Sequence, residues 1–286
     1  MIELSLLTQL VAFADCGTLT EAAERLHTSQ PAVTRAMKKL EQELDLILFI
    51  RGKNRLVLNT TGKMAVRYAR LVLQEAEDFE TRLHSYDRSL HTISIGYCAP
   101  LPQMLLTPII NTLFNGMTLS ADMKDDADFF TKLQYRTYQL AVTHTAPADT
   151  SVFHARKCGH EDLFLSLPAS SPLASYPELG LRHLSGQTLL LLNRIGFWMQ
   201  AVREKTPHIR YLLQEERDTL TELAANSPYP IFSSSHFINR GETVTGRIQV
   251  PLSDPECHAD YFLVCLKSDL PVYGILFDRI TEHTII

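Results

Sequence analysis

The chain has 286 residues, of which 45% are hydrophobic, and a formal net charge of −5. This length allows two or three domains, and this hydrophobic content excludes a largely disordered protein. No apolar run is long enough to span a bilayer, and Glu3 stands where a secretory signal would carry positive charge, so we expect a cytoplasmic protein without a membrane partner. The five cysteines are scattered and odd in number, which argues against a disulfide framework.

Positive charge is concentrated near the start of the chain. From Arg25 to Arg70 there are ten Lys and Arg residues and three acidic residues, a net charge of +7, whereas the remainder carries −12. This asymmetry predicts a segment that binds a polyanion, attached to an acidic body. A basic face that is merely solvated would explain the charge alone equally well.

The first 26 residues predict two helices. Apolar residues recur at helical spacing from Leu4 to Ala14, and Gly17 is expected to end that helix. Thr18 followed by Glu21 has the spacing of a capping box, so a second, short helix should run to Leu26.

A third helix is predicted after the turn at residues 27–29. Thr28 or Ser29 is expected to cap it, and Pro31 lies in its first turn, where a missing N–H costs little. One side of the helix would bury Val33, Met37, Leu40 and Leu44, and the other would carry Gln30, Pro31, Thr34, Arg35 and Lys38. A helix, a tight turn and a second helix with a polar, basic outer face are typical of a helix-turn-helix that binds bases and phosphates of double-stranded DNA.

The segment "LFIRGKNRLVL", residues 48–58, reads as two short strands around a Gly-Lys-Asn turn. Arg51, Lys53 and Arg55 would lie near the tip of this wing, together with Asn54. Such a tip can lie against phosphates or enter a minor groove.

Two stretches, "FADCGTLTEAAERLHTSQPAVTRAMKKLEQELDLILFIR" and "LVLNTTGK", resemble the LysR-type transcriptional regulators of bacteria. The family's small-Gln-Pro-small-x-Ser/Thr-Arg signature falls on Ser29, Gln30, Pro31, Ala32, Thr34 and Arg35, and Leu19 stands where the family often has Phe. The resemblance implies a winged helix-turn-helix over residues 1–59, whose recognition helix begins near Ser29. The predicted DNA-binding residues are Thr28, Ser29, Gln30, Pro31, Thr34, Arg35, Lys38, Arg51, Lys53, Asn54 and Arg55.

Residues 60–90 read as one long helix, which Thr60 or Thr61 could cap. Apolar residues form a nearly heptad stripe along it: Ala65, Tyr68, Val72, Ala76, Phe79, Leu83, Tyr86 and Leu90. The stripe could pack on its own domain, but the many flanking charges favour an exposed helix. The family resemblance implies a linker that pairs two subunits, so we expect a dimer or tetramer on an imperfect palindromic promoter site.

The remaining residues, 91–286, alternate predicted strands and helices, which indicates an α/β body. We expect strands at 92–97, 138–144, 162–168, 186–193, 229–234 and 261–268, with helices at 101–114 and 271–285. The resemblance implies a two-subdomain effector-binding domain like a periplasmic binding protein. Subdomain I would comprise 91–161 and 263–286, subdomain II 162–262, and the crossovers would lie near 160–163 and 260–263.

An effector site is predicted where loops follow strand ends, because free backbone N–H groups gather there. The loops are 97–103, 142–145 and 193–198, and the predicted residues are Cys98, Ala99, Pro100, Thr143, His144, Asn193, Arg194, Phe197 and Trp198. Arg194 and the aromatic pair favour a small, anionic, partly apolar effector. Family members often carry Ser or Thr where this chain has Cys98 and Ala99. Arg194 could instead be a surface cation, and Trp198 a core residue.

The sequence gives weaker signals for metal binding and for cysteine redox chemistry. His154, Cys158, His160, Cys257 and His258 are metal-ligand types, but their spacing matches no standard zinc pattern, so no metal is expected. A redox role for Cys98 stays open, although no neighbouring cation would lower its pKa.

There is no Gly-rich phosphate loop or nucleophile elbow, so we expect no cofactor, no catalytic residue and no enzyme. The function favoured by the sequence is a DNA-binding transcriptional regulator modulated by a small-molecule effector. The alternatives are an α/β binding or catalytic protein with an N-terminal helical interaction domain, and a non-specific DNA-binding protein.

Overall fold

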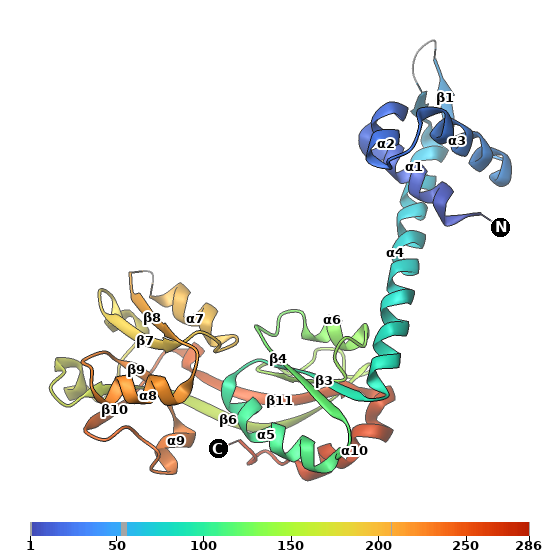
Figure 1. The fold of residues 1–286 in the computed structure, drawn as a ribbon. Helices are drawn as coiled ribbons and strands as arrows, with labels where there is room; N and C mark the ends of the chain where they lie inside the picture. Colours follow the sequence, from blue (N-terminus) through green and yellow to red (C-terminus); the bar gives the residue numbers. More distant parts are fainter. Residues whose placement is uncertain (1, 53–55, 207, 286) are drawn as a thin grey trace. The chain divides into compact units, whose positions relative to one another are not determined.

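The computed structural model describes residues 2–52, 56–206 and 208–285, which divide into two compact units, 1–84 and 85–286 (Figure 1). We call the first unit the head and the second the body, and describe each by itself.

The head contains the predicted helices and wing strands: α1 (Leu4–Cys16), α2 (Leu19–Arg25), α3 (Gln30–Leu44), antiparallel β1 (Phe49–Arg51) and β2 (Leu56–Leu58), and the start of α4 (Thr60–Ser89). Gly17 ends α1 with φ 81°, a left-handed conformation that glycine adopts without steric cost. The Thr18 hydroxyl accepts a hydrogen bond from the backbone N–H of Glu21 at 3.2 Å, as the capping pattern predicts.

Two predicted caps are different in the structure. Ser29 occupies the N-cap position of α3, but its side chain makes no capping hydrogen bond. The side chain of Asn59, rather than Thr60 or Thr61, caps α4, because its Oδ1 accepts from the N–H of Gly62 at 2.7 Å. Asn and Thr both suit N-caps, so the sequence alone did not distinguish these neighbours.

One apolar core holds the head together. Val33, Met37 and Leu40 of α3 are buried against α1, the wing and the first turns of α4, whose Val66 and Ala69 belong to the same core. The predicted inner face of the third helix is therefore confirmed, except that Leu44 is only partly buried. This packing turns the opposite face of α3 outward.

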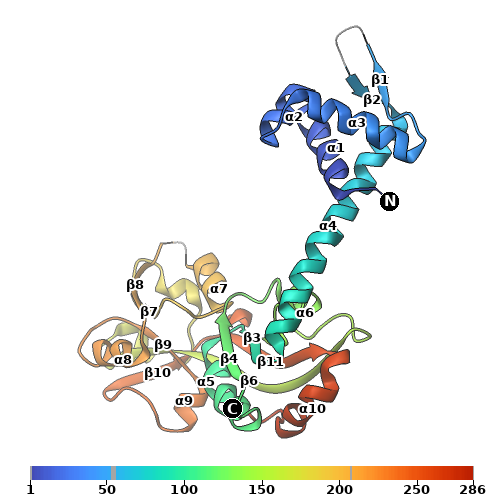
Figure 2. The same cartoon turned by 45° about the vertical axis from the view of Figure 1, so that its right-hand side comes forward.

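The body has a first sheet with the order β4-β3-β5-β11-β6. Its strands are β3 (Thr92–Tyr97), β4 (Thr118–Met123), β5 (Leu140–Thr143), the first half of β6 (Phe153–Pro168) and β11 (His258–Leu266). In Figures 1 and 2, α5 (Pro100–Leu113) and α10 (Leu270–Arg279) lie side by side against this sheet. The short helix α6 (Phe129–Gln134) contacts β5 and β11.

A second group of strands forms around the other half of β6, which pairs with β9 (Ile231–Ser234) and β10 (Arg247–Pro251). Parallel β7 (Thr188–Leu192) and β8 (Arg210–Gln214) lie beside them with α7 (Trp198–Lys205), α8 (Arg217–Ala225) and α9 (Ser235–Asn239). Single 3₁₀ turns occupy Pro172–Ser175, Leu181–Leu184, Pro255–Cys257 and Lys267–Asp269.

The strand β6 joins the two groups, as its light-green ribbon in Figure 1 shows. Through Asp162 it pairs with β11, and from Leu163 onward with β9. The change of partner therefore occurs between two adjacent residues, Asp162 and Leu163. It lies within residues 160–163, where a crossover was expected from the sequence.

Three predictions for the body need correction. The strand expected at 162–168 begins nine residues earlier, at Phe153, and the closing helix ends at Arg279 instead of continuing to 285. Strands β4, β8 and β10 were not anticipated. Most of β4 and β8 is exposed or half-buried, which leaves no continuous apolar run to reveal them.

Candidate DNA-binding face and effector cavity

The outer face of α3 is exposed and polar. Thr28, Ser29, Gln30, Pro31, Arg35 and Lys38 are exposed, and Thr34 is half-buried. The Gln30 side chain donates to the Thr34 hydroxyl at 3.3 Å, and that hydroxyl donates to the Gln30 carbonyl at 2.9 Å. Among the described residues, Arg35 and Lys38 have no ion-pair or side-chain hydrogen-bond partner, so both cations are free to meet an external anion.

Four other cations of the head, Arg25, Lys39, Arg51 and Arg70, are paired with its own carboxylates. Lys39 Nζ lies 2.6 Å from Glu3 Oε1, and hydrogen bonding with Lys39 lowers the pKa of Glu3. Arg25 and Arg70 both contact Asp15, at 3.1 Å and 2.5 Å. The net positive charge is therefore not spread evenly, and the exposed cations without a described partner include Arg35 and Lys38 on the outer face of α3 and Lys63 and Arg67 on α4.

The wing is attached to α3 by one carboxylate. Glu41 accepts hydrogen bonds from the N–H groups of Leu48 and Phe49 at 2.8 and 3.1 Å, and its second oxygen lies 2.7 Å from Arg51 Nη2. Arg51, predicted to face DNA, is thus ion-paired within the head, although its side chain is 53% exposed. Lys53, Asn54 and Arg55, the other predicted wing residues, lie outside the described residues.

A continuous apolar stripe is exposed along α4. Tyr68, Val72, Phe79, Leu83 and Tyr86 are between 46% and 65% exposed, and Leu90 just beyond the helix is 54% exposed. In the stripe predicted from the sequence, only Ala65 and Ala76 are half-buried. Exposed aromatic and aliphatic side chains at this regular spacing form an uncovered seam.

The three predicted effector loops do meet in the body. The carbonyl of Cys98 accepts from the N–H of Phe197 at 2.9 Å, and the N–H of Cys98 donates to Val142 at 3.0 Å. Gly196 has φ 62°, and a Cβ placed on it would lie 1.7 Å from the Cys98 carbonyl oxygen. The loops are therefore packed directly against each other, with no room between these residues for a ligand.

Aromatic contacts close the same region. The rings of His144 and Phe197 stack with their centres 4.1 Å apart and an interplanar angle of 3°. The centres of the Phe197 and Trp198 rings are 4.2 Å apart. Asp126 holds the edge of the same His144 ring, with its Oδ1 2.8 Å from Nδ1. The side chain of Thr143 is buried and donates to the Thr145 carbonyl at 2.7 Å.

A cavity of about 640 Å³ lies next to these loops, in the body. Its walls are mostly apolar and come from α5, β6, β7, α8, β9 and the segment 237–244. The polar and charged lining residues are Glu161, Ser166, Arg217, Asp218, Thr221, Ser233, Ser234, Glu242 and Thr243. Its volume and mostly apolar walls suit a small organic molecule.

Glu161 is the most unusual of the lining residues, because its carboxyl group is fully buried. Burial raises its pKa to about 7, although the Tyr261 and Ser234 hydroxyls and Arg217 act in the opposite direction. Tyr261 donates to Glu161 Oε2 at 2.5 Å. The Ser234 hydroxyl is also buried; it lies near enough to lower the pKa of Glu161 but completes no hydrogen bond of normal geometry within the described part of the chain. Two polar groups of the cavity can therefore still bind a ligand.

Arg217 supplies positive charge at the same cavity. Its guanidinium lies 3.3 Å from the centre of the Phe237 ring, a cation–π contact that orients it. Desolvation lowers the pKa of Arg217, but the group stays cationic at neutral pH because a guanidinium titrates far above that range.

Comparison with known proteins identifies the chain. Residues 4–63 match the family described as bacterial regulatory helix-turn-helix protein, lysR family, and residues 88–274 match the LysR substrate binding domain. The chain belongs to the LysR family. It is therefore a DNA-binding transcriptional regulator whose binding is modulated by an effector, as the resemblance of its first residues implied.

Two relatives that match most of this LysR-family regulator have low sequence identity to it. The RuBisCO operon transcriptional regulator of Allochromatium vinosum is 26% identical over 76% of this chain and 74% of its own. The hydrogen peroxide-inducible genes activator of Haemophilus influenzae is 24% identical over 87% of this chain and 86% of its own. Among solved structures, DarR of Vibrio fischeri in complex with DNA has a TM-score of 0.50 at 16% identity, covering 96% of this chain and 98% of its own, which shows a shared fold.

The cavity of this regulator includes only two of the predicted effector residues, Pro100 and Trp198. Cys98, Ala99, Thr143, His144 and Phe197 form the packed loop junction instead, and Asn193 and Arg194 are exposed but do not line the cavity. The hypothesis that Cys98, Thr143 and Arg194 border one shared cleft is thus not supported by the described cavity. The reason is close packing at Gly196, which the sequence pattern did not reveal.

Sequence reasoning missed the polar cavity residues Glu161, Arg217 and Ser234. A glutamate between His160 and Asp162 in a strand reads as surface charge, and only strand pairing shows which face it occupies. No local motif marks Arg217. A useful signal would have been strand alternation, because Glu161 shares its face of β6 with the apolar Leu163 and Leu165.

Two other expectations concern the cysteines and the membrane. Cys98 is fully buried, and burial raises its pKa well above the ordinary value, which suppresses the reactive thiolate. All five cysteines are free. In the described ranges 2–52, 56–206 and 208–285, every helix is too short or too polar to cross a membrane.

Proposed function

We propose that the exposed face of α3 reads the operator, with Gln30, Thr34 and Arg35 at base edges or flanking phosphates and Thr28, Ser29, Pro31 and Lys38 beside them. The single observation behind this proposal is that Arg35 and Lys38 are exposed and unpaired among the described residues, whereas Arg25, Lys39, Arg51 and Arg70 are engaged by carboxylates. Free cations on a helix that fits a major groove supply both phosphate attraction and base recognition.

The experiment is to isolate the genomic fragments that the purified protein retains at physiological salt and to titrate one of them in gel shifts. Arg35→Ala should weaken binding to that fragment by about tenfold or more. Arg203→Ala, which removes an exposed arginine from α7, should leave binding unchanged. Equal binding by wild type and Arg35→Ala would remove Arg35 from the proposed reading face.

The second part of the proposal is assembly through the seam on α4. Residues 60–90 then act as the linker, 1–59 as the DNA-binding domain and 91–286 as the effector-binding domain. Pairing would bury Val72, Phe79 and Tyr86, whose apolar surface is unfavourably exposed to water in a single chain. Paired heads would require two half-sites on one face of the duplex, so the operator is expected to be an imperfect palindrome.

Light scattering on two matched variants tests this assembly. Phe79→Asp places a carboxylate in the seam and should yield monomers at concentrations where wild type is dimeric or tetrameric. Thr81→Asp adds the same charge at an exposed position two residues away, outside the stripe, and should not change the mass. A dimeric Phe79→Asp protein would locate the pairing surface elsewhere.

The third part concerns the effector, for which we propose the 640 Å³ cavity as the binding site. An apolar body would fit the leucine and isoleucine walls, and an anionic group would pair with Arg217. The buried Glu161 carboxyl and Ser234 hydroxyl can exchange hydrogen bonds with a further polar group. A small, partly apolar carboxylate satisfies all of these contacts.

A panel of aliphatic and aromatic monocarboxylates can test this class by thermal shift. A compound that binds here should raise the melting temperature of wild type and of Arg210→Gln, which changes an exposed arginine on β8. It should fail to do so for Arg217→Gln. If no carboxylate stabilises the wild type, the proposed anionic class of effector is wrong. If Arg217→Gln is stabilised as much as wild type, the proposed binding site is wrong.

A further inference from the structure

Four polar side chains cluster on the outer face of β6 and β11. Because alternate residues of a strand share a face, His160 and Asp162 lie on one side of β6 while Glu161 points to the cavity on the other. The strand register places His258 opposite Asp162 and Asp260 opposite His160. Residues nearly 100 positions apart thus meet across one antiparallel pair.

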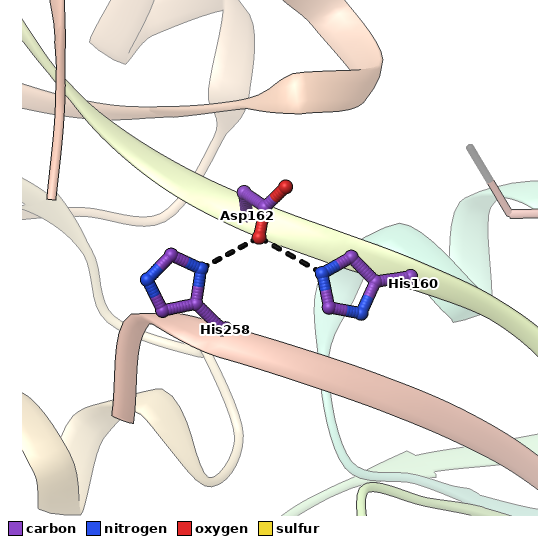
Figure 3. A group of neighbouring side chains, drawn as sticks. All are labelled: His160, Asp162 and His258. Atoms are coloured by element: carbon purple, nitrogen blue, oxygen red, sulfur yellow. Dashed lines mark hydrogen bonds and ion pairs between the residues drawn. The ribbon is translucent and has the colours of Figure 1, made fainter. Parts of the chain in front are cut away.

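The ring nitrogens of both histidines converge on one carboxylate oxygen, as Figure 3 shows. Asp162 Oδ1 lies 2.8 Å from His160 Nε2 and 2.6 Å from His258 Nδ1. One ligand atom from each residue lies within 4.8 Å of the other two. Ligands at about 2.0–2.2 Å from a tetrahedral zinc ion are roughly 3.3 Å apart, so small side-chain shifts would admit an ion.

A neighbouring carboxylate already orients one of the imidazoles. His160 Nδ1 lies 2.7 Å from Asp260 Oδ1, and the same oxygen lies 2.7 Å from Lys157 Nζ. With Nδ1–H donating to Asp260, Nε2 is the nitrogen that can give its lone pair to an ion lying between it and Asp162, in place of the Nε2–H that donates to Asp162 Oδ1 when no ion is bound. A carboxylate behind a metal-binding histidine is a common support in zinc sites, because it fixes the tautomer and strengthens the ligand.

The cluster is accessible from solvent. His160 and His258 are exposed and Asp162 is half-buried, so an ion could enter without opening the core. The cysteines considered from the sequence do not take part: Cys158 and Cys257 are buried, and burial raises the pKa of each to about 12. His154 lies against Phe277 instead, with ring centres 4.7 Å apart.

We propose that His160, Asp162 and His258 bind a divalent transition metal ion of the zinc type, with water in the remaining position. Two imidazoles and one carboxylate favour zinc, cobalt or nickel over magnesium or calcium, which prefer oxygen ligands. The site is distinct from the effector cavity, because it lies on the opposite face of β6. An ion there would clamp β6 to β11 next to Asp162 and Leu163, where β6 changes partner.

The test is calorimetric titration of chelator-treated, full-length protein with zinc chloride at neutral pH. Wild type should bind one ion per chain at this site. His258→Ala and Asp162→Asn should each lower that affinity by about tenfold or more, and Asp260→Asn by about 10–100-fold through the lost support of His160. His283→Ala removes an exposed histidine elsewhere and should match wild type.

Thermal melting and cobalt absorption complete the test. Zinc should raise the melting temperature of wild type but not of His258→Ala, and melting in chelator shows whether the variants are folded. A cobalt spectrum without thiolate charge transfer is expected from nitrogen and oxygen ligands. The proposal is overturned if wild type binds no zinc, or if folded His258→Ala and Asp162→Asn bind it as wild type does. Neither result depends on DNA or an effector.

Discussion

The outer face of α3 and the cavity of the body hold their polar groups in opposite ways. On α3, Arg35 and Lys38 project into solvent with no described partner. In the cavity, Glu161 and Ser234 are buried, and Arg217 is held over an aromatic ring. Exposed charge suits a polyanion whose binding releases counterions, whereas buried polar groups gain strength from desolvation and select a small molecule by its fit. The two regions should therefore respond differently to substitution, pH and salt.

The largest effect is expected where the body has no spare room. Gly196→Ala would place a Cβ 1.7 Å from a backbone oxygen at a left-handed φ of 62°, so we expect a loss of about 3 kcal/mol or more in the free energy of unfolding. Gly241 has φ 70°, and a Cβ added there would meet nothing within 4 Å, so Gly241→Ala should cost only about 1 kcal/mol. Urea denaturation measures both losses. Equal losses for the two variants would mean that the backbone at the loop junction can shift to accommodate the added Cβ.

Next in size is the effect of pH on Glu161. Its pKa rises from 4.5 to about 7 on folding, so the native state holds this proton more tightly and its contribution to stability is lost as pH rises through that window. Relative to Glu161→Gln, wild type in chelator should lose about 2 kcal/mol between about pH 5 and about pH 8.

Urea denaturation at the two pH values measures this loss. Gln keeps an oxygen that can accept from Tyr261, so the variant should fold. Glu222→Gln, at an exposed position of α8, serves as the control and should follow wild type at both values. A pH-independent difference between wild type and Glu161→Gln would show that the Glu161 carboxyl is better solvated than its burial indicates.

A smaller effect is expected on the head, where exposed groups contribute little to folding. Arg35→Ala should leave the free energy of unfolding within about 0.5 kcal/mol of wild type while costing about 1–3 kcal/mol of specific DNA binding. Urea denaturation and gel-shift titration on the same preparation separate the two. A stability loss as large as the binding loss would show that Arg35 supports the fold.

The smallest effect is expected from Lys38, which we expect to contact phosphates and not base edges. Lys38→Gln should weaken specific and non-specific fragments alike and reduce the slope of log affinity against log salt by about one unit. Lys53 and Arg55, which lie outside the described residues, are predicted from the sequence to act in the same way. A loss confined to one DNA sequence would instead assign Lys38 to base recognition.

The helices of the head could be predicted from the sequence because each is specified by local signals. Val33, Met37 and Leu40 recur at helical spacing, and Thr18 and Gly17 mark helix ends that the structure shows. The N-cap of α4 was misplaced by one residue, because Asn59 and Thr60 are chemically similar caps. The periodicity alone then predicted which side of α3 is buried and which side is exposed.

The cavity could not be predicted in the same way, because its residues meet through strand pairing. Glu161 and Tyr261 are 100 positions apart in sequence and become neighbours only in the register of β6 and β11. The loop prediction used a sound rule, that ligands bind beyond strand ends, but it could not include the contact between Gly196 and Cys98 that fills the junction. Pro100 and Trp198 line the cavity because they adjoin both the junction and its wall, and their role in effector binding stays a prediction.

The attachment of the wing by Glu41 has a consequence for how this regulator could change its target. Glu41 lies near the end of α3 and holds Leu48, Phe49 and Arg51, whereas Gln30, Thr34 and Arg35 lie in the first turns of the same helix. Substitutions among the first group would disturb the wing, but substitutions among the second would not. If α3 reads the operator as proposed, the head separates the residues that choose a sequence from those that keep its shape, so operator preference could diverge, or be retargeted by engineering, on an unchanged scaffold.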